Sequence, residues 1–231
     1  MKSLCIIPAR GGSKRIPRKN IKPFLGRPVI SYAIETALKS GLFDEVMVST
    51  DDEEIAEVAR QYGASVPFMR SAEAASDTAP DMVVLREVLT EYAKLGKTFD
   101  TFCSLYPCTP LVTAEKLKAG METLIETGVD LVFPVLRFSS PPLRGFVVRN
   151  GEWVRLHPEY TFTRSQDMEP IFYGAGQYYF YNAKTYLEKT DVERTIHAFE
   201  ISEMEVQDVD NEVDWRMAEI KYMMRSEKEN V

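Results

Sequence analysis

Short apolar runs and longer segments with apolar residues at helical spacing alternate along the first 135 residues of the chain. The runs of strand length lie at 4–8, 45–49, 64–68, 101–105 and 130–135. The segments of helical spacing lie at 28–38, 53–62, 81–95 and 113–127. Strands that alternate with helices of about ten residues or more indicate βαβ units. We therefore expect an α/β fold with a mostly parallel sheet that has helices on both faces.

The pattern changes after the last of these strands. Two strand-like segments, 145–149 and 152–156, flank Asn150-Gly151. This dipeptide supplies the positive φ angles of a type I′ turn, so the segments predict a β-hairpin. We interpret residues 137–172 as an insertion that carries this hairpin.

The last part of the chain returns to the core. Strand-like segments lie at 176–181 and 197–201, and a helix is expected from about 212 to 224. The predicted core therefore comprises residues 1–136 and 173–231.

Composition restricts the class of protein. A chain of 231 residues with 45% hydrophobic and 27% charged residues suits one α/β domain with an insertion. No apolar run approaches the roughly twenty residues that span a bilayer, and the N-terminus lacks a secretory signal, so we expect a cytoplasmic protein without a membrane partner. The cysteines Cys5, Cys103 and Cys108 are odd in number, which favours free structural thiols. A pI near 5.1 argues against nucleic acid as a partner.

A basic stretch follows the first strand and interrupts this acidic background. Six cationic side chains and two glycines lie between Arg10 and Lys22, and no acidic residue lies among them. Ligand sites in open α/β sheets lie beyond the carboxyl ends of strands, so this position favours a polyphosphate ligand, although a solvated basic loop is the alternative. Neither the P-loop spacing nor the G-x-G-x-x-G dinucleotide fingerprint is present.

The stretch from Ile7 to Asn20 resembles the I-P-A-R-G-G-S-K-x-x-P-x-K-N signature of the sugar-activating cytidylyltransferases, the family that makes CMP-sialic acid and its bacterial relatives. The resemblance implies a Rossmann-like nucleotidyltransferase core. It also implies that a set of residues in two loops binds CTP. These residues are Ala9, Arg10, Gly11, Gly12, Ser13, Lys14, Lys19, Asn20, Arg70 and Ser76.

A pair of acids near the C-terminus offers a site for a divalent cation. Asp208 and Asp210 lie two apart in an extended segment, which points both side chains to the same side. Magnesium needs only one or two carboxylates, but capping of the following helix by Asp210 or Asn211 is an alternative role. The segment resembles the family's late D-x-D motif, which implies Mg²⁺ binding by Asp208 and Asp210. Together with Arg10 and Lys19, these acids are the expected catalytic residues.

Candidate sugar-binding residues lie mostly in the insertion and in the strand-like segment after it. Arginine has a planar fork that matches a carboxylate, and glutamine bonds to hydroxyl or acylamino groups. The motifs R-S-Q-D at 164–167 and A-G-Q-Y-Y at 175–179 resemble those of enzymes that activate pseudaminic acid. The candidates are Tyr106, Arg144, Arg164, Gln166, Gln177 and Tyr179.

Two departures from the family pattern concern the sugar. Tyr106 stands where the sialic-acid enzymes have glutamine, which weakens the case for N-acetylneuraminic acid. Tyr173-Gly174 stands where the family commonly has His-Asp, which removes one expected sugar contact. For single polar residues of this kind, an ordinary surface role is the alternative.

The insertion also predicts a protein partner. A hairpin that exposes Phe146, Trp153 and Tyr160 would be a poor solitary surface. The resemblance implies that the partner is a second copy of the chain, and that the insertion forms the homodimer contact and completes the neighbour's sugar site.

No residue pair suggests covalent catalysis, because His157 and His197 have no nucleophile beside them in the sequence. We expect a magnesium-dependent cytidylyltransferase in which the anomeric hydroxyl of pseudaminic acid attacks the α-phosphate of CTP, giving CMP-pseudaminic acid and pyrophosphate. Activation of N-acylneuraminate or legionaminate is the alternative within the class. A non-catalytic nucleotide-binding regulator is the alternative from another class.

Overall fold

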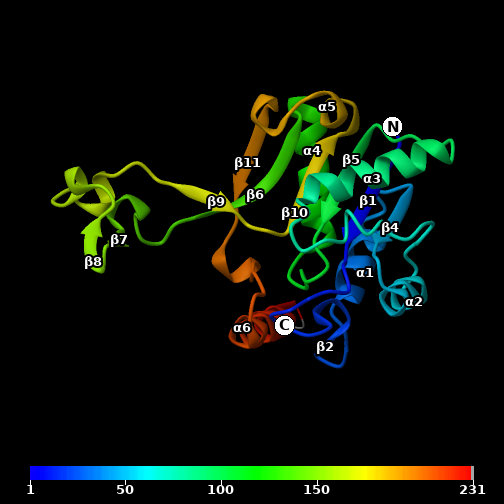
Figure 1. The fold of residues 1–231 in the computed structure, drawn as a ribbon, viewed down its shortest axis with the longest axis horizontal. Helices are drawn as coiled ribbons and strands as arrows, with labels where there is room; N and C mark the ends of the chain where they lie inside the picture. Colours follow the sequence, from blue (N-terminus) through cyan, green and yellow to red (C-terminus); the bar gives the residue numbers. More distant parts are fainter. Residues whose placement is uncertain (230–231) are drawn as a thin grey trace.

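The computed structural model describes residues 1–229, with side chains through residue 227, and centres on a seven-stranded sheet (Figure 1). Across the sheet the strands follow the order β11 (Ile196–Glu200), β6 (Leu131–Arg137), β10 (Tyr178–Asn182), β5 (Thr101–Leu105), β1 (Ser3–Pro8) and β4 (Glu45–Ser49), and β9 (Phe172–Gly174) also pairs with β6. Strand β1 is parallel to β4 and β5, and β6 is parallel to β11, whereas β10 runs antiparallel between β5 and β6. The expected mostly parallel sheet is confirmed.

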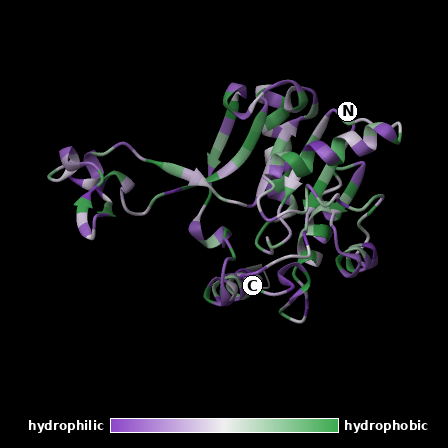
Figure 2. Ribbon diagram, viewed as in Figure 1, coloured by the Kyte–Doolittle hydropathy of each residue, from purple (hydrophilic) through white to green (hydrophobic). Residues whose placement is uncertain are grey.

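Helices cover both faces of the sheet, and alternate side chains of β1 pack against them on opposite faces. Cys5 and Ile7 pack on one face against α1 (Ile30–Ser40), α2 (Glu53–Gln61) and α4 (Ala114–Thr127). Leu4 and Ile6 pack on the other face against α3 (Asp81–Lys94) and α5 (Ala183–Glu188). Strands buried on both faces have few polar positions, and β6 is accordingly largely green in Figure 2.

Local capping explains where several helices begin and end. The Asp52 carboxylate accepts a hydrogen bond from the Ile55 amide at 3.0 Å, so α2 begins at Glu53 as expected. Thr113 caps α4 in the same way through the Lys116 amide. Helix α1 ends at Gly41, whose φ of 66° is the left-handed conformation that glycine adopts readily.

Two sequence predictions about strands are wrong. The segment 64–68 is not a strand, because only Ser65 forms a bridge, with Met47, and Pro67 lacks an amide hydrogen for a sheet ladder. The strand expected at 176–181 begins at Tyr178 instead. Gly176 has a φ of 63°, which separates β9 from β10 as the chain crosses from β6 toward β5.

The segment between β6 and β9 leaves the core and projects as an arm (Figure 1). It contains the hairpin of β7 (Phe146–Arg149) and β8 (Glu152–Arg155), and Asn150 and Gly151 have φ angles of 53° and 83°. The predicted type I′ turn is therefore confirmed. Several large apolar side chains of the arm are exposed, namely Phe146, Val148, Trp153, Leu156 and Phe162.

Helix α6 (Glu212–Glu229) brings the C-terminal part of the chain back to the N-terminal loop. Trp215 and Val209 pack in one cluster with Phe24 and Tyr32, and the Phe24 and Trp215 rings lie 5.7 Å apart in an edge-on contact. This cluster fixes the end of the chain against the loop after β1. No helix within residues 1–229 is both long enough and apolar enough to cross a membrane.

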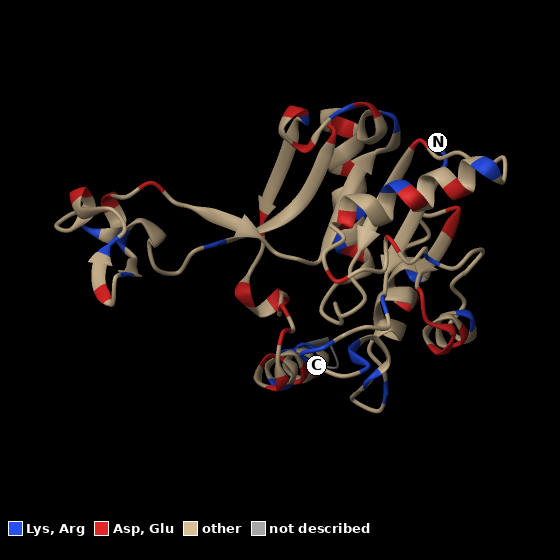
Figure 3. Ribbon diagram, viewed as in Figure 1, with Lys and Arg blue, Asp and Glu red and all other residues tan. Residues whose placement is uncertain are grey.

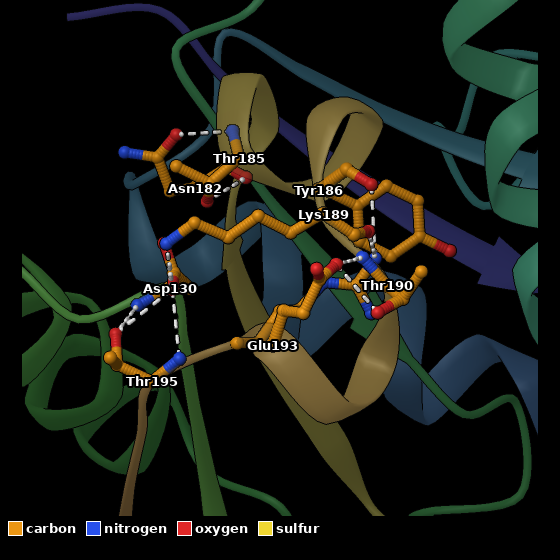
Figure 4. Close-up of polar contacts among 9 residues, drawn as sticks. Asp130, Asn182, Thr185, Tyr186, Lys189, Thr190, Glu193 and Thr195 are labelled. Carbon is orange, nitrogen blue, oxygen red and sulfur yellow. Dashed lines mark hydrogen bonds and ion pairs between the residues drawn. The ribbon is translucent and has the colours of Figure 1, made fainter.

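A buried acid joins the starts of β6 and β11 (Figure 4). The Asp130 carboxylate accepts hydrogen bonds from Lys189 Nζ at 2.7 Å, the Thr195 amide at 2.8 Å and Thr195 Oγ1 at 2.9 Å. Burial alone would raise the pKa of Asp130, but the hydrogen bonds from Lys189 and Thr195 outweigh it and hold that pKa below its usual value.

Candidate active site

A cavity of about 580 Å³ lies at the carboxyl ends of β1 and β5. Pro8 ends β1 and Tyr106 follows β5, and both residues line the cavity. Gly176, in the break between β9 and β10, lines it as well. The position agrees with the general rule that ligands of open α/β sheets bind beyond the carboxyl ends of the strands.

The basic stretch divides into two groups of cations. Arg10, Lys14, Arg15 and Lys19 line the cavity. The other two cations bind neighbouring elements: Arg18 pairs with Asp52 and Glu54, whereas Lys22 pairs with Glu212 at 2.6 Å. Figure 3 shows the basic stretch in blue, between β1 and β2 (Pro23–Phe24) and beside α6.

The two glycines of the loop have different surroundings. A Cβ atom on Gly11 would lie 2.7 Å from Asp52 Oδ2, so glycine is required there by contact with the start of α2. The Gly11 amide donates to Asp51 Oδ1 at 2.9 Å. A Cβ atom on Gly12 would meet nothing within 4 Å. Ala9 is buried and its amide donates to the Ser49 carbonyl, whereas Ser13 lines the cavity.

Lys19 and Asn20 tie the loop to itself and to the C-terminal segment. The Asn20 side-chain amide donates to the Arg10 carbonyl at 2.9 Å, and Lys19 Nζ donates to the Val209 carbonyl at 2.8 Å. The latter bond joins residues 190 positions apart. Cys108 packs beside them, and burial raises the pKa of its thiol to about 12, so the thiol stays protonated at neutral pH.

The two late acids flank a buried apolar residue of the segment after β11. Val209 is buried in the cluster with Trp215, whereas Asp208 lines the cavity and Asp210 forms an ion pair with Arg15 at 2.6 Å. The side chain of Asp210 does not cap α6. Asn211 Oδ1 accepts from the amides of Val213 and Asp214, and the Asp214 carboxylate accepts from the amides of Asp210 and Asn211.

The donor set at this segment suits magnesium. Within residues 1–229 no group of three or more His, Cys, Asp or Glu side chains could hold a metal by itself. Two carboxylates are enough for Mg²⁺, which keeps waters and takes phosphate oxygens as its remaining ligands. Asp208 and Asp210 therefore fit a metal that arrives with a polyphosphate.

A second loop, between Arg70 and α3, forms another wall of the cavity. Arg70 is only 8% exposed, and it donates to the Ser49 carbonyl at 2.6 Å and to Ser49 Oγ at 3.0 Å. Burial lowers the pKa of its guanidinium group. Ser76 also lines the cavity, and its carbonyl accepts a 3.4 Å hydrogen bond from Arg10.

Two cavity acids had no individual role in the site predicted from the sequence, although Asp77 follows Ser76 in the predicted nucleotide loop. Asp77 pairs with both Arg10 and Lys14, and Asp81 accepts a hydrogen bond from the Tyr106 hydroxyl. The only available signal was that both acids belong to the polar loop after Arg70 or directly follow it. Burial, followed by the charge of Asp81, raises the pKa of Tyr106.

The predicted sugar residues fall into two groups. Tyr106 lines the cavity, and the Tyr179 ring lies 5.8 Å from the Tyr106 ring. Gln177 is buried and donates to the Glu205 carbonyl at 2.7 Å, which leaves its carbonyl oxygen without a partner among residues 1–227.

The remaining three candidates lie in the arm and do not line this cavity. Arg144 bonds to Ser165 Oγ, and Arg164 bonds to the Asp167 carboxylate. Gln166 lines a second cavity of about 500 Å³ at the base of the arm, together with Phe138 and Ile201. Seven of the ten predicted nucleotide residues line the cavity, and Ala9, Gly11 and Gly12 do not. Of the six predicted sugar residues only Tyr106 lines it.

The arrangement is suited to binding a polyanion at one wall and a cation at the facing segment. Four cations of the loop after β1 and Arg70 line the cavity, and the carboxylates of Asp208 and Asp210 lie beside that loop. Such a site stabilises charge on a transferring phosphoryl group without a covalent intermediate.

Comparisons with known proteins agree with this geometry. A family model described as Cytidylyltransferase matches residues 4–229. A pseudaminic acid cytidylyltransferase of Campylobacter jejuni is 40% identical over 98% of this chain and 99% of the relative. A CMP-N,N'-diacetyllegionaminic acid synthase of Legionella pneumophila is 34% identical over 95% of each chain.

Solved structures with low sequence identity share the fold. A CMP:2-keto-3-deoxy-manno-octonic acid synthetase complexed with CTP gives a TM-score of 0.71 at 19% identity, over 98% of this chain and 100% of that one. Since the family model covers residues 4–229 and the Campylobacter relative matches the chain over 98% of its length, the chain belongs to the cytidylyltransferase family of enzymes.

Proposed function

We propose that this enzyme transfers CMP from CTP to pseudaminic acid and releases pyrophosphate. The observation that carries the proposal is the cavity at the carboxyl ends of β1 and β5, where loop cations lie against the segment of Asp208 and Asp210. The name of the Campylobacter relative supports this choice of sugar.

In the proposed reaction, the anomeric hydroxyl oxygen of the sugar attacks the α-phosphorus of CTP, and the bond to the pyrophosphate oxygen breaks. Such a transfer depends on positioning and on stabilisation of phosphate charge. Arg10, Lys14 and Lys19 supply positive charge in the cavity. Ser13 offers a further donor to the phosphates, whereas Arg70 and Ser76 bound the part of the cavity assigned to the nucleoside.

We propose that Asp208 and Asp210 hold Mg²⁺. The ion would offset the charge of the polyphosphate and lower the pKa of a coordinated hydroxyl group. Asp210 would exchange its ion pair with Arg15 for the metal, which would free Arg15 to face the phosphates.

We also propose that two chains form a homodimer through their arms. The exposed Trp153 and Phe162 side chains favour burial against a partner. A partner's arm would then supply Arg144, Arg164 and Gln166, which do not line the nucleotide cavity of their own chain. The three free cysteines favour the reducing cytoplasm as the place of action.

The test is release of pyrophosphate from CTP and Mg²⁺ with a panel of purified sugars, combined with mass spectrometry of the CMP-sugar product. We expect turnover with pseudaminic acid. Turnover with N-acetylneuraminic or legionaminic acid alone would refute the sugar assignment, and the Legionella relative makes legionaminic acid the second candidate. If the protein binds CTP but releases no pyrophosphate from it with any of the sugars, the result would instead indicate a non-catalytic regulator.

A further inference from the structure

The carboxylate of Asp77 joins two loops at the proposed phosphate site. Asp77 Oδ1 lies 2.9 Å from Arg10 Nη1, and Asp77 Oδ2 pairs with Lys14 Nζ. Arg10 and Lys14 belong to the loop after β1, whereas Asp77 belongs to the loop between Arg70 and α3. All three residues line the cavity of about 580 Å³.

The carboxylate interacts with the cations as a phosphate group would. Its two oxygens are divided between a guanidinium group and an ammonium group, which are the groups that bind phosphate oxygens in nucleotide sites. Hydrogen bonds and charge from Lys14, followed by the charge of Arg10, lower the pKa of Asp77. The carboxylate is therefore ionised at neutral pH and competes directly with a phosphate for the same donors.

The contact can exchange without unfolding of the loop. The Asp77 side chain is 47% exposed, and ion pairs that are exposed to water contribute little to the stability of a fold. The first residue of the loop is held separately, because the Ser71 amide donates to Glu87 Oε1 at 3.0 Å. Rotation of the Asp77 side chain is therefore sufficient to release both cations.

We propose that Asp77 is a built-in counter-anion, which occupies Arg10 and Lys14 at the cavity and is displaced when the polyphosphate of the nucleotide binds. Asp77 is then a positioning residue that lowers the affinity of the site for CTP and for pyrophosphate. Return of the carboxylate to the two cations assists release of the pyrophosphate product. This inference rests on the proposed function, because it takes the cavity as a polyphosphate site.

The counter-anion role and an ordinary structural contact predict opposite changes in ligand affinity when Asp77 is replaced. If Asp77 only braced the two loops, its removal would disorder Arg10 and weaken ligand binding. If it competes with phosphate, its removal strengthens binding, because one unit of negative charge near the ligand is lost.

The experiment measures binding of CTP and, separately, of inorganic pyrophosphate to the Asp77→Asn variant by titration calorimetry at low salt and without sugar. We expect Kd values roughly three- to thirty-fold lower than those of the parent, as expected for loss of one charge a few ångströms from the ligand. The gain should shrink at about 1 M salt because of screening. Glu73→Gln is the matched control, since Glu73 is exposed on the same loop and carries the same charge, and its Kd values should stay within about two-fold of the parent.

Unchanged or weaker binding of both ligands by Asp77→Asn would overturn the inference, as would an equal gain in Glu73→Gln. Failure of the proposed function would look different: the parent would bind neither CTP nor pyrophosphate. A steady-state measurement adds a second readout, because the counter-anion role predicts a lower KM for CTP and stronger inhibition by pyrophosphate.

Discussion

At the scale of single residues, different side chains of the segment 208–214 cap α6 and face the cavity, two roles that its composition could not assign. Asn211 and Asp214 accept the free amides at the start of α6, so the helix does not need the carboxylate of Asp210. That carboxylate instead faces Arg15 at the cavity. The sequence alone left capping and metal binding open for Asp210, because both roles use an acid at the same place.

We expect Asp210→Ala to lower kcat by at least about 100-fold, since it removes one of the two proposed metal ligands. The thermal unfolding midpoint should change little, because the cap of α6 remains in place. Magnesium-dependent pyrophosphate release checks the first expectation and circular dichroism the second. Glu212→Ala is the control, because it removes a nearby acid that pairs with Lys22, and the variant should retain activity within a few-fold. Magnesium-supported turnover of Asp210→Ala near the parent rate would reject the metal role.

Lys19→Met should lower kcat/KM for CTP by about 100- to 1,000-fold, because the ammonium group lies in the cavity and also bonds to the Val209 carbonyl. Steady-state kinetics with varied CTP measures the effect. Lys22→Met is the control, since Lys22 comes from the same loop but pairs with Glu212 outside the cavity. Equal losses in the two variants would mean that general loop charge, and not a specific contact of Lys19, supports the reaction.

At the scale of elements, local patterns predicted what depends on near neighbours in the sequence. The Asn150-Gly151 turn and the start of α2, which Asp52 caps, are satisfied within a few residues, and the predictions of the hairpin and of this helix are confirmed. The placement of β10 between β5 and β6 depends on pairing across about fifty to eighty positions, and no local pattern distinguishes an antiparallel strand in that place. The cavity contact of Asp77 escaped prediction for the same reason, because its partners lie more than sixty positions away.

The Asp130 network should make stability depend on pH. The pKa of Asp130 lies below its usual value of about 4. The ionised carboxylate therefore stabilises the folded chain at pH above ~4, and this effect is lost as the pH falls through the folded-state pKa. Asp130→Asn should lower the free energy of unfolding by about 2–3 kcal/mol at pH 7, because Lys189 loses its buried counter-charge.

Urea unfolding at several pH values measures this difference, which should shrink as the pH falls below ~4 toward the folded-state pKa. Glu188→Gln is the control, because that acid is exposed at the end of α5 and directly precedes Lys189. A difference between parent and Asp130→Asn that stays constant over the whole pH range would show that the effect is one of packing and not of charge.

At the scale of the whole molecule, the arm is the part that a single chain leaves unsatisfied. It projects from the core in Figure 1, and Trp153 is 76% exposed. Residues proposed to bind the sugar lie on it, away from the nucleotide cavity of the same chain. Its hairpin could be predicted from the turn dipeptide, but its projection away from the core could not, because no sequence period records where a hairpin points.

Trp153→Glu should convert a dimer to a monomer, because it places a charge in the proposed apolar contact. Sedimentation velocity measures the mass of the particle, and pyrophosphate release should fall together with it. Leu95→Glu introduces the same charge at an exposed apolar position just beyond α3, and it should leave both properties unchanged. A parent protein that sediments as a monomer and turns over at full rate would contradict the dimer proposal.

The hydrogen bond between Lys19 and the Val209 carbonyl has a consequence for how the protein is made. A ribosome completes the loop after β1 about 190 codons before it reaches Val209, whose carbonyl Lys19 binds. Until then the growing chain carries the cationic loop but lacks Trp215, which packs in one cluster with Ile16 of that loop, and Asp208, which lines the cavity. A chain that stopped before residue 207 would therefore lack one wall of the proposed CTP site.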